Sequence, residues 1–150
     1  MDFSTILQDA RTTISGFKSK NNDGIVIIRW ATATGKSRLS VELSEFFDIE
    51  VISSDSRQIF RKMDIWTDKI SAEIRKKIPH HQIDIVDPDE TYTAGQWKED
   101  ADHQVDEILA RGKFPFIVGG TGLYIDTIYK NFSLPECPPD YALRSELEEQ

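Results

Sequence analysis

The strongest constraint on the fold of this chain is a short apolar run, residues 24–28, that leads through residues 30–37 into an amphipathic segment, residues 38–47. The run is rich in β-branched residues, which favours a buried strand of a parallel sheet. The later segment spaces its large apolar residues as on one face of a helix: Leu39, Leu43, Phe46 and Phe47. A strand, a turn and a helix in this order predict an α/β fold with a parallel sheet flanked by helices.

The turn between strand and helix carries all but one position of the phosphate-binding pattern G-x-x-x-x-G-K-[ST], the P-loop. In that pattern backbone N–H groups surround phosphate oxygens, the lysine reaches further phosphates, and the hydroxyl ligates Mg²⁺. Gly35, Lys36 and Ser37 fill the last three roles, so Ser37 is the predicted metal ligand and the sheet is predicted to be P-loop NTPase-like. The predicted phosphate-binding residues are Trp30, Ala31, Thr32, Ala33, Thr34, Gly35, Lys36 and Ser37.

Trp30 stands at the first position of the pattern, where glycine is expected. Glycine lets the backbone approach phosphate, whereas a side chain restricts that approach and makes a left-handed φ cost about 1–2 kcal/mol. The alternative interpretation of this segment is therefore a chance Gly-Lys-Ser at the beginning of an ordinary helix.

The composition predicts a single globular domain without a membrane span. The chain has 150 residues, of which 39% are hydrophobic and 29% charged, and it has no apolar run long enough to cross a bilayer. Residues 1–22 lack the apolar core of a signal peptide and instead space apolar residues as in an amphipathic helix. Together with the single Cys137, this predicts a cytoplasmic protein.

The net charge of −8 has the wrong sign for a domain that holds nucleic acid by bulk electrostatics. Any RNA contact must therefore come from local basic patches. Two short groups are candidates, although such groups more often form solvated faces: Arg57, Arg61 and Lys62, and then Arg75, Lys76 and Lys77.

The remaining pattern continues the alternation of strands and helices. Strands are predicted at residues 50–53, 80–88 and 113–118, and helices at residues 71–77, 93–110 and 123–129. We expect an amino-terminal helix over 1–22, an α/β core over 23–133, and over 134–150 a proline-rich linker followed by the start of a helical region. The adjacent His80 and His81 lack the spacing of a helical zinc pair, so hydrogen bonding or strand packing is the better interpretation of both.

Polar residues follow the second predicted strand, and a second glycine-rich turn follows the last one. Asp55 comes two residues after its strand, where ligands bind in open α/β sheets, although Asp after a strand also commonly forms an Asx turn or helix cap. Residues 119–122, Gly-Gly-Thr-Gly, lead from a strand into a helix as residues 30–37 do. Two such turns at one edge of a sheet favour a phosphate-bearing substrate more strongly than either alone.

Six motifs in order resemble the tRNA dimethylallyltransferase family. They are Ala-Thr-Ala-Thr-Gly-Lys-Ser at 31–37, Ser-Ser-Asp-Ser-Arg-Gln at 53–58, Met-Asp-Ile at 63–65, Pro-His-His at 79–81, Ile-Asp-Ile-Val-Asp-Pro at 83–88 and Val-Gly-Gly-Thr-Gly-Leu-Tyr at 118–124. The resemblance spans about residues 24–149. Adenylate isopentenyltransferases are similar in the P-loop and Pro-His-His, but they usually differ after the aspartate, so Ser-Arg-Gln favours the tRNA type.

The resemblance implies transfer of a dimethylallyl group from dimethylallyl diphosphate to the exocyclic amine of the adenosine beside the tRNA anticodon, with Mg²⁺. It implies that Asp55, Lys36, Thr121 and Thr34 are catalytic. Asp55 would receive a proton or hydrogen bond from the amine, while Lys36 and Mg²⁺ would stabilise the leaving diphosphate. The implied tRNA-binding residues are Asp55, Ser56, Arg57, Gln58, Thr121 and Arg144. The expected partners are tRNA and dimethylallyl diphosphate, with no membrane, and the chain is expected to be a monomer.

The chain departs from the family in two kinds of feature. The family continues well past residue 150, so this sequence resembles its amino-terminal part, and Ala31 replaces a common proline. Trp30 and Trp66 both stand where the family has glycine. Our hypothesis is that UGA codons for glycine have been translated as tryptophan; UGG in the gene at either position would refute it there.

Two other functions remain open from the sequence. A P-loop kinase of small molecules or nucleotides shares the strand, the loop and the Lys36-Ser37 pair but transfers phosphate from ATP. A catalytically inactive fragment would fold in the same way but fail to bind diphosphate because of Trp30.

Overall fold

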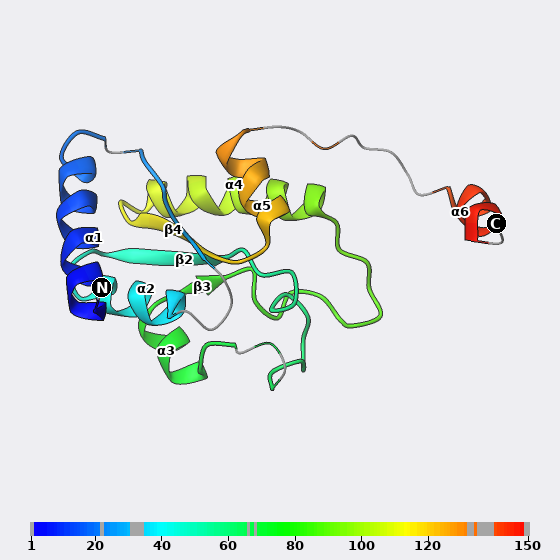
Figure 1. Cartoon of the computed structure of the whole chain (residues 1–150), viewed down its shortest axis with the longest axis horizontal. Coiled ribbons are helices and arrows are strands. Elements are labelled where there is room, and N and C mark those ends of the chain that lie inside the picture. The colour runs from blue at the N-terminus through cyan, green and yellow to red at the C-terminus, as the bar shows by residue number, and fades with distance from the viewer. Residues whose placement is uncertain are drawn as a thin grey trace.

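The computed structural model describes residues 2–21, 23–30, 35–65, 67, 69–131, 134 and 140–148. Ten elements alternate along this part of the chain (Figure 1). The helices are α1 (Phe3–Lys18), α2 (Lys36–Ser44), α3 (Ala72–Lys77), α4 (Ala94–Ala110), α5 (Gly122–Tyr129) and α6 (Tyr141–Glu148). The strands are β1 (Val26–Arg29), β2 (Ile49–Ser53), β3 (His80–His81) and β4 (Phe114–Gly119).

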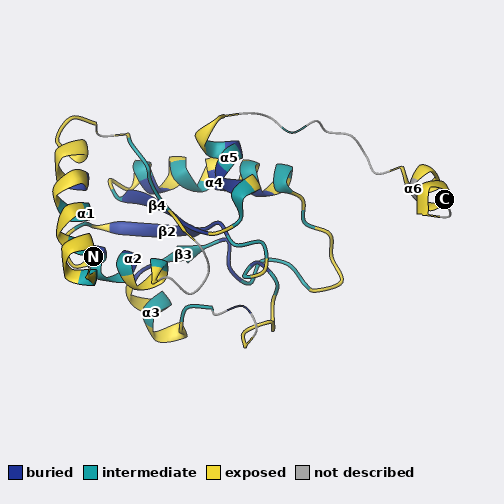
Figure 2. Cartoon of the chain, viewed as in Figure 1, coloured by how far each residue is buried: buried dark blue, intermediate teal, exposed yellow. Residues whose placement is uncertain are grey.

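The four described strands form one parallel sheet in the order β1-β4-β2-β3. Both strands in the middle, β2 and β4, are buried along their whole length (Figure 2). Because all strands run the same way, their carboxyl ends meet at one edge of the sheet, where the loops after β1, β2 and β4 come together. The α/β architecture predicted from the sequence is confirmed.

Each face of the sheet carries its own apolar cluster. On one face, Leu43 of α2 and Ile14 of α1 pack with Val51 and Phe116 of the central strands. On the other, Trp97, Ala101 and Ile108 of α4 pack with Tyr124 of α5 and with Ile52 and Ile117. Figure 1 shows α4 and α5 on one side of the sheet and α2 and α3 on the other. Trp97 is fully buried in this second cluster.

Local sequence signals explain where several helices begin and end. Asp2 caps α1 by accepting a hydrogen bond from the Thr5 amide, and Thr93 forms a reciprocal capping box with Gln96 at the start of α4. Gly112 follows α4 with a φ of 73°, a backbone conformation that glycine adopts without strain. The predicted helix over 1–22 is therefore present, although α1 itself ends at Lys18.

The third strand is much shorter than the sequence predicted. Alternation over residues 80–88 predicted a strand, but only His80 and His81 pair with β2. Gln82 and Asp84 adopt φ values of 60° and 58°, which interrupt an extended strand. The chain returns to pairing only at Val86, which forms an isolated bridge with Phe60. The prediction of a continuous strand over 80–88 was wrong because the backbone leaves the extended conformation at Gln82 and again at Asp84, which accepts a hydrogen bond from the buried Lys69.

Within the described part of the chain, no helix is both long and apolar enough to cross a membrane.

Candidate active site

The two glycine-containing turns lie side by side, as the sequence predicted. Strands β1 and β4 are paired, and Arg29 at the end of β1 is opposite Gly119 at the end of β4. A Cβ atom at Gly120 would lie 3.5 Å from the Trp30 carbonyl oxygen, so the two turns are in contact. We call the carboxyl ends of β1, β2 and β4 with their adjoining loops the loop edge: residues 29–30, 35–37, 54–58 and 119–122.

The turn after β4 is also fitted closely to the loop after β2. The Ser54 amide donates to the Val118 carbonyl at 2.9 Å, and the Thr121 amide donates to the Ser54 carbonyl at 3.0 Å. A Cβ at Gly119 would lie within 2.4–2.5 Å of Ser54 atoms, including its backbone carbonyl. Only glycine fits there, so Gly119 is explained by close backbone packing rather than by a ligand.

Thr121 joins the last turn to the segment that follows Asp55. Its Oγ1 accepts a hydrogen bond from the Ser56 amide at 2.9 Å and lies 3.3 Å from Ser56 Oγ, to which it donates. Thr121 is the residue before α5, but its side chain makes no capping bond to that helix. Thr121 and Ser56, 65 residues apart, are thus in direct contact, and their predicted roles at the site stay predictions.

Asp55 lies between these elements and is half-buried. Its Oδ1 accepts a hydrogen bond from the Arg57 amide at 2.9 Å, which is the Asx turn that the alternative interpretation predicted. Burial, and then the nearby negative charge of Asp55, raise the pKa of Tyr124 above its usual value. Asp55 therefore shapes its own turn and lies near enough to Tyr124 to affect the pKa of that residue.

Trp97 holds the end of β2 from the side of α4. Its indole Nε1 donates to the Ser53 carbonyl at 3.1 Å, and its ring stacks on Tyr124 with centroids 4.6 Å apart. Because Ser53 is two residues before Asp55, this buried contact fixes the strand from which the aspartate projects. No periodicity in the sequence indicates this hydrogen bond, since the bonded residues are far apart in the chain.

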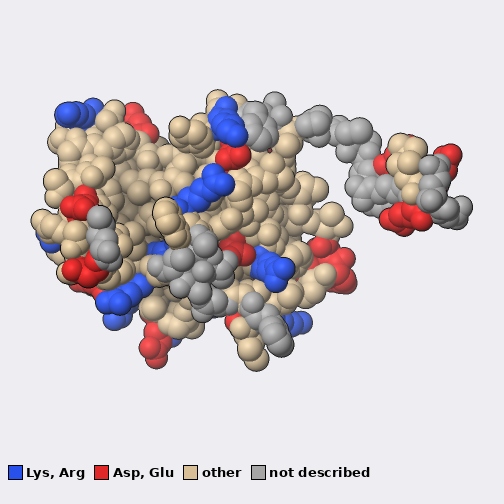
Figure 3. Space-filling model, viewed as in Figure 1, with Lys and Arg blue, Asp and Glu red and all other residues tan. Residues whose placement is uncertain are grey.

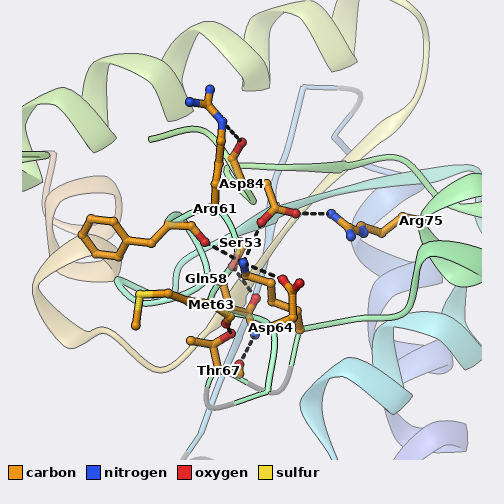
Figure 4. A network of polar contacts seen from close by, with 10 residues as sticks. Ser53, Gln58, Arg61, Met63, Asp64, Thr67, Arg75 and Asp84 are labelled. Carbon is orange, nitrogen blue, oxygen red and sulfur yellow. Dashed lines mark hydrogen bonds and ion pairs between the residues drawn. The ribbon is translucent and has the colours of Figure 1, made fainter. Parts of the chain in front are cut away.

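A polar network supports the loop that follows Asp55 (Figure 4). Ser53 Oγ donates to Gln58 Oε1 at 3.0 Å, and Gln58 Nε2 donates to the Thr67 carbonyl at 3.1 Å. Thr67 Oγ1 in turn donates to the Met63 carbonyl. The Gln58 amide is thus used inside the protein, and its predicted contact with tRNA stays a prediction.

Lys69 is the centre of the same network. Its side chain is 3% exposed, and its ammonium donates to Asp84 at 2.6 Å, to Asp64 at 3.0 Å and to the Phe60 carbonyl at 2.6 Å. Arg75 contacts the second oxygen of Asp84 at 2.6 Å. Burial alone would raise the pKa of Asp84, but the hydrogen bonds from Lys69 and Arg75 outweigh it and lower that pKa.

Two of the basic residues considered for RNA contact, Arg61 and Arg75, form hydrogen bonds and ion pairs within the chain. Arg61 donates to the carbonyls of Asp84 and Ile85 and pairs with Asp87 at 3.3 Å, while Arg75 pairs with Asp84. Arg57 is exposed at the loop edge. Figure 3 shows Lys and Arg side chains interspersed with Asp and Glu on the face in view, with no extended basic field.

Of the predicted P-loop, the structure describes Trp30 and residues 35–37. Gly35 precedes α2 with a φ of 88°, a left-handed conformation that glycine adopts readily, and its carbonyl accepts from the Leu39 amide. Lys36, half-buried, and the exposed Ser37 form the first turn of α2. Residues 31–34, and with them Ala31, Thr32, Ala33 and Thr34, lie outside the described residues, as do Trp66, Cys137 and the Arg144 side chain.

Trp30 stands at the first position of the pattern, where a left-handed φ would cost about 1–2 kcal/mol. Trp30 is not one of the described residues that have a positive φ, so this cost does not arise. Its side chain is 70% exposed. Bulk, rather than backbone strain, is the remaining way in which Trp30 could affect a ligand.

An apolar cavity of about 590 Å³ reaches the loop edge from the side of α1. It is lined by apolar residues of α1, β1 and α2, including Ile6, Ile28 and Leu39. Four lining residues belong to the loop edge, and we call them the cavity rim: Arg29, Trp30, Gly35 and Lys36. Arg29 is not among the site residues predicted from the sequence, although an arginine at the end of an apolar strand and directly before a P-loop was the available signal.

A buried ion cluster lies toward the opposite end of the sheet, and none of its residues belongs to the loop edge. Glu50 of β2 has a side chain 4% exposed and contacts Arg111 at 2.8 Å, His81 at 2.7 Å and Lys113 at 3.3 Å. Burial alone would raise the pKa of Glu50, but hydrogen bonds from Arg111, His81 and Lys113 outweigh it and lower the pKa to about 2. His81 is thus used in hydrogen bonding, as expected.

Comparison with known proteins places this architecture in a sequence family. The family model described as IPP transferase matches residues 58–150. The chain is 45% identical over 125 residues to a tRNA dimethylallyltransferase of Dictyoglomus turgidum, covering 83% of this chain and 38% of the relative. It is 47% identical over 124 residues to the tRNA dimethylallyltransferase of an Exiguobacterium species, covering 83% of this chain and 40% of the relative.

Solved structures agree with the sequence relatives. A full-length tRNA isopentenylpyrophosphate transferase from Bacillus halodurans matches with a TM-score of 0.73 and 43% identity, over 85% of this chain and 42% of that one. A eukaryotic dimethylallyltransferase acting on tRNA matches with a TM-score of 0.70 and 33% identity, over 83% and 31% of the two chains. The predicted resemblance and P-loop NTPase-like fold are confirmed, and the chain spans about two fifths of the length of the curated relatives described above.

Proposed function

The chain belongs to the IPP transferase family, and from this premise we propose that it carries the donor site and the catalytic aspartate of a tRNA dimethylallyltransferase. The reaction transfers a dimethylallyl group from dimethylallyl diphosphate to the exocyclic amine of an adenosine beside the tRNA anticodon. The observation that carries the proposal is the contact of Thr121 with Ser56, which closes the β4 turn against the segment after Asp55.

In the proposed step the adenosine nitrogen forms a bond to C1 of the donor while the C1–O bond to diphosphate breaks. Asp55 receives the proton that the amine loses, and the diphosphate leaves with the bonding electron pair. Lys36 at the start of α2 stabilises the negative charge that grows on the leaving oxygens. Thr34 and Thr121 are proposed to supply further hydrogen bonds near the reacting groups.

Mg²⁺ is the metal that the proposal requires, and the residues present fit it. Magnesium is bound through few protein oxygens together with substrate phosphates and water, and Ser37 offers an exposed hydroxyl in the first turn of α2. When bound, the ion neutralises diphosphate charge. Ser37 would hold it beside the phosphates that the α2 amides and Lys36 bind.

The acceptor side of the proposal rests on the loop after β2. Asp55, Ser56, Arg57 and Gln58 are proposed to bind the target nucleotide, together with Thr121 and Arg144. The target base must leave its stack to reach a site at the edge of a sheet. A cytoplasmic location and a monomeric state remain predictions of the proposal.

The test is transfer of labelled dimethylallyl diphosphate to a tRNA with adenosine beside its anticodon, in the presence of Mg²⁺. Because the chain spans about two fifths of the length of its relatives, we expect incomplete transfer by the chain alone, slowed about a hundredfold or more in Asp55→Asn, which removes the proton acceptor. Donor binding should be unchanged in Asp55→Asn, because the carboxylate acts on the amine. Transfer of phosphate from ATP in place of the prenyl group would contradict the proposal and support a kinase.

A further inference from the structure

Arg29 ends β1 on the side of the sheet that α5 covers. A Cβ atom at Gly122, the first residue of α5, would lie 3.2 Å from Arg29 Nη2, so the guanidinium lies against the glycine turn that follows β4. Any larger residue at Gly122 would displace it. Arg29 thus places a permanent positive charge at the contact between the two turns of the loop edge.

The internal partner of this guanidinium holds it only loosely. Arg29 Nη1 and Asp126 Oδ1 are 3.4 Å apart, and the arginine side chain is 55% exposed. Exposed pairs of this kind contribute little to stability. Asp126 also accepts from Lys130 at 3.0 Å, so the aspartate keeps a cationic neighbour when Arg29 turns away.

Arg29 also lies beside two of the predicted phosphate-binding residues. Arg29, Gly35 and Lys36 are among the residues that line the same cavity of about 590 Å³. A guanidinium presents several N–H groups in one plane and binds two oxygens of a phosphate at once, which a lysine ammonium does not do. A diphosphate has enough oxygens to engage both cations.

We propose that Arg29 is a second cationic ligand for the diphosphate, and that it exchanges Asp126 for phosphate oxygens when the donor binds. This inference rests on the proposed function, because that function supplies the diphosphate. It assigns Arg29 to donor binding and to stabilisation of the leaving group, alongside Lys36. Asp126 is then the resting partner that keeps Arg29 beside Gly122 while the site is free of donor.

The experiment is calorimetric titration of inorganic pyrophosphate and of dimethylallyl diphosphate, each with Mg²⁺, into the chain and three variants. Arg29→Gln should weaken binding of both ligands at least about tenfold, because charge-assisted hydrogen bonds are lost. The affinity of Arg29→Lys for both ligands should lie between those of the unaltered chain and Arg29→Gln. Lysine keeps the positive charge but lacks the planar guanidinium that binds two oxygens at once. Lys130→Gln is the matched control: it removes an equally exposed charge that also contacts Asp126, but it does not line the cavity rim.

The outcomes separate this inference from the function on which it rests. Binding by the unaltered chain that is weakened by Arg29→Gln and kept by Lys130→Gln supports the role of Arg29. Equal binding by the unaltered chain and Arg29→Gln, or equal weakening by both glutamine variants, overturns the role of Arg29 and leaves the donor site standing. Absence of binding by the unaltered chain overturns both proposals. Circular dichroism of each variant checks that the fold is retained.

Discussion

Thr121 accepts the amide hydrogen of Ser56 across 65 residues of sequence, at 2.9 Å. This hydrogen bond ties the turn after β4 to the segment after β2, and both segments project from buried central strands. The loop edge therefore owes its shape to a contact between two loops as well as to the order of the strands.

Thr121→Val should loosen this edge without a change of volume. The substitution leaves the Ser56 amide without its acceptor, which costs about 1–3 kcal/mol where water cannot replace it. We expect a lower urea midpoint and a loss of prenyl transfer. Thr121→Ser keeps the hydroxyl and should retain most of the stability to urea and most of the prenyl transfer. Similar losses in the two variants would contradict a role for the Thr121 hydroxyl.

Lys69→Met should destabilise the fold strongly. The ammonium is buried among Asp64, Asp84 and the Phe60 carbonyl, so its removal leaves carboxylates short of a cationic partner. Breaking a buried pair in this way costs about 3–5 kcal/mol. Urea unfolding of Lys69→Met, Asp84→Asn and the double variant gives the coupling energy, and strictly additive losses would contradict a direct interaction.

Acid should destabilise the chain through Glu50. Its pKa is lowered to about 2 in the folded protein, so the folded state holds the carboxylate ionised where the unfolded chain takes up a proton. This contribution is complete above the ordinary glutamate pKa and is lost as the pH falls from about 4.5 toward 2. Thermal unfolding of Glu50→Gln should show a flatter pH dependence across that interval; an unchanged slope would contradict the assignment.

Trp30→Gly tests whether the tryptophan disables the phosphate site. Because the Trp30 side chain is 70% exposed, we expect the unaltered chain and the variant to bind dimethylallyl diphosphate with Mg²⁺ within tenfold, about 1.4 kcal/mol. Calorimetric titration of both proteins measures the difference. Binding that appears only in the variant would instead support the catalytically inactive fragment.

Strong local patterns in the sequence were sufficient to predict the parallel sheet and its two glycine-containing turns. The signals for these strands lie in neighbouring residues of the sequence. The apolar runs were correctly predicted to form β1 and β4, and Asp55 follows β2 as predicted. Residues 80–88 show the limit of this approach. Their alternation fits a strand, but positive φ values at Gln82 and Asp84 interrupt it, and Asp84 accepts a hydrogen bond from Lys69, fifteen residues away.

Long-range polar contacts in the candidate site could not be predicted in the same way. The bond from Trp97 to the Ser53 carbonyl and the position of Arg29 beside Gly122 depend on how helices pack on the sheet. Gln58 illustrates the same difficulty, because a side chain expected to face a nucleotide makes its hydrogen bonds within the protein. Residue type indicated the chemistry, whereas packing determined which groups remain available for a ligand.

The most direct test of the central claim is Mg²⁺-dependent binding of dimethylallyl diphosphate to the unaltered chain, to Lys36→Ala and to Arg38→Ala, measured by calorimetry. Lys36 and Arg38 lie in the same turn of α2, but only Lys36 lines the cavity rim. We predict binding by the unaltered chain and by Arg38→Ala, and at least about tenfold weaker binding by Lys36→Ala. Equal binding by all three proteins, or none by the unaltered chain, would contradict a donor site at the loop edge.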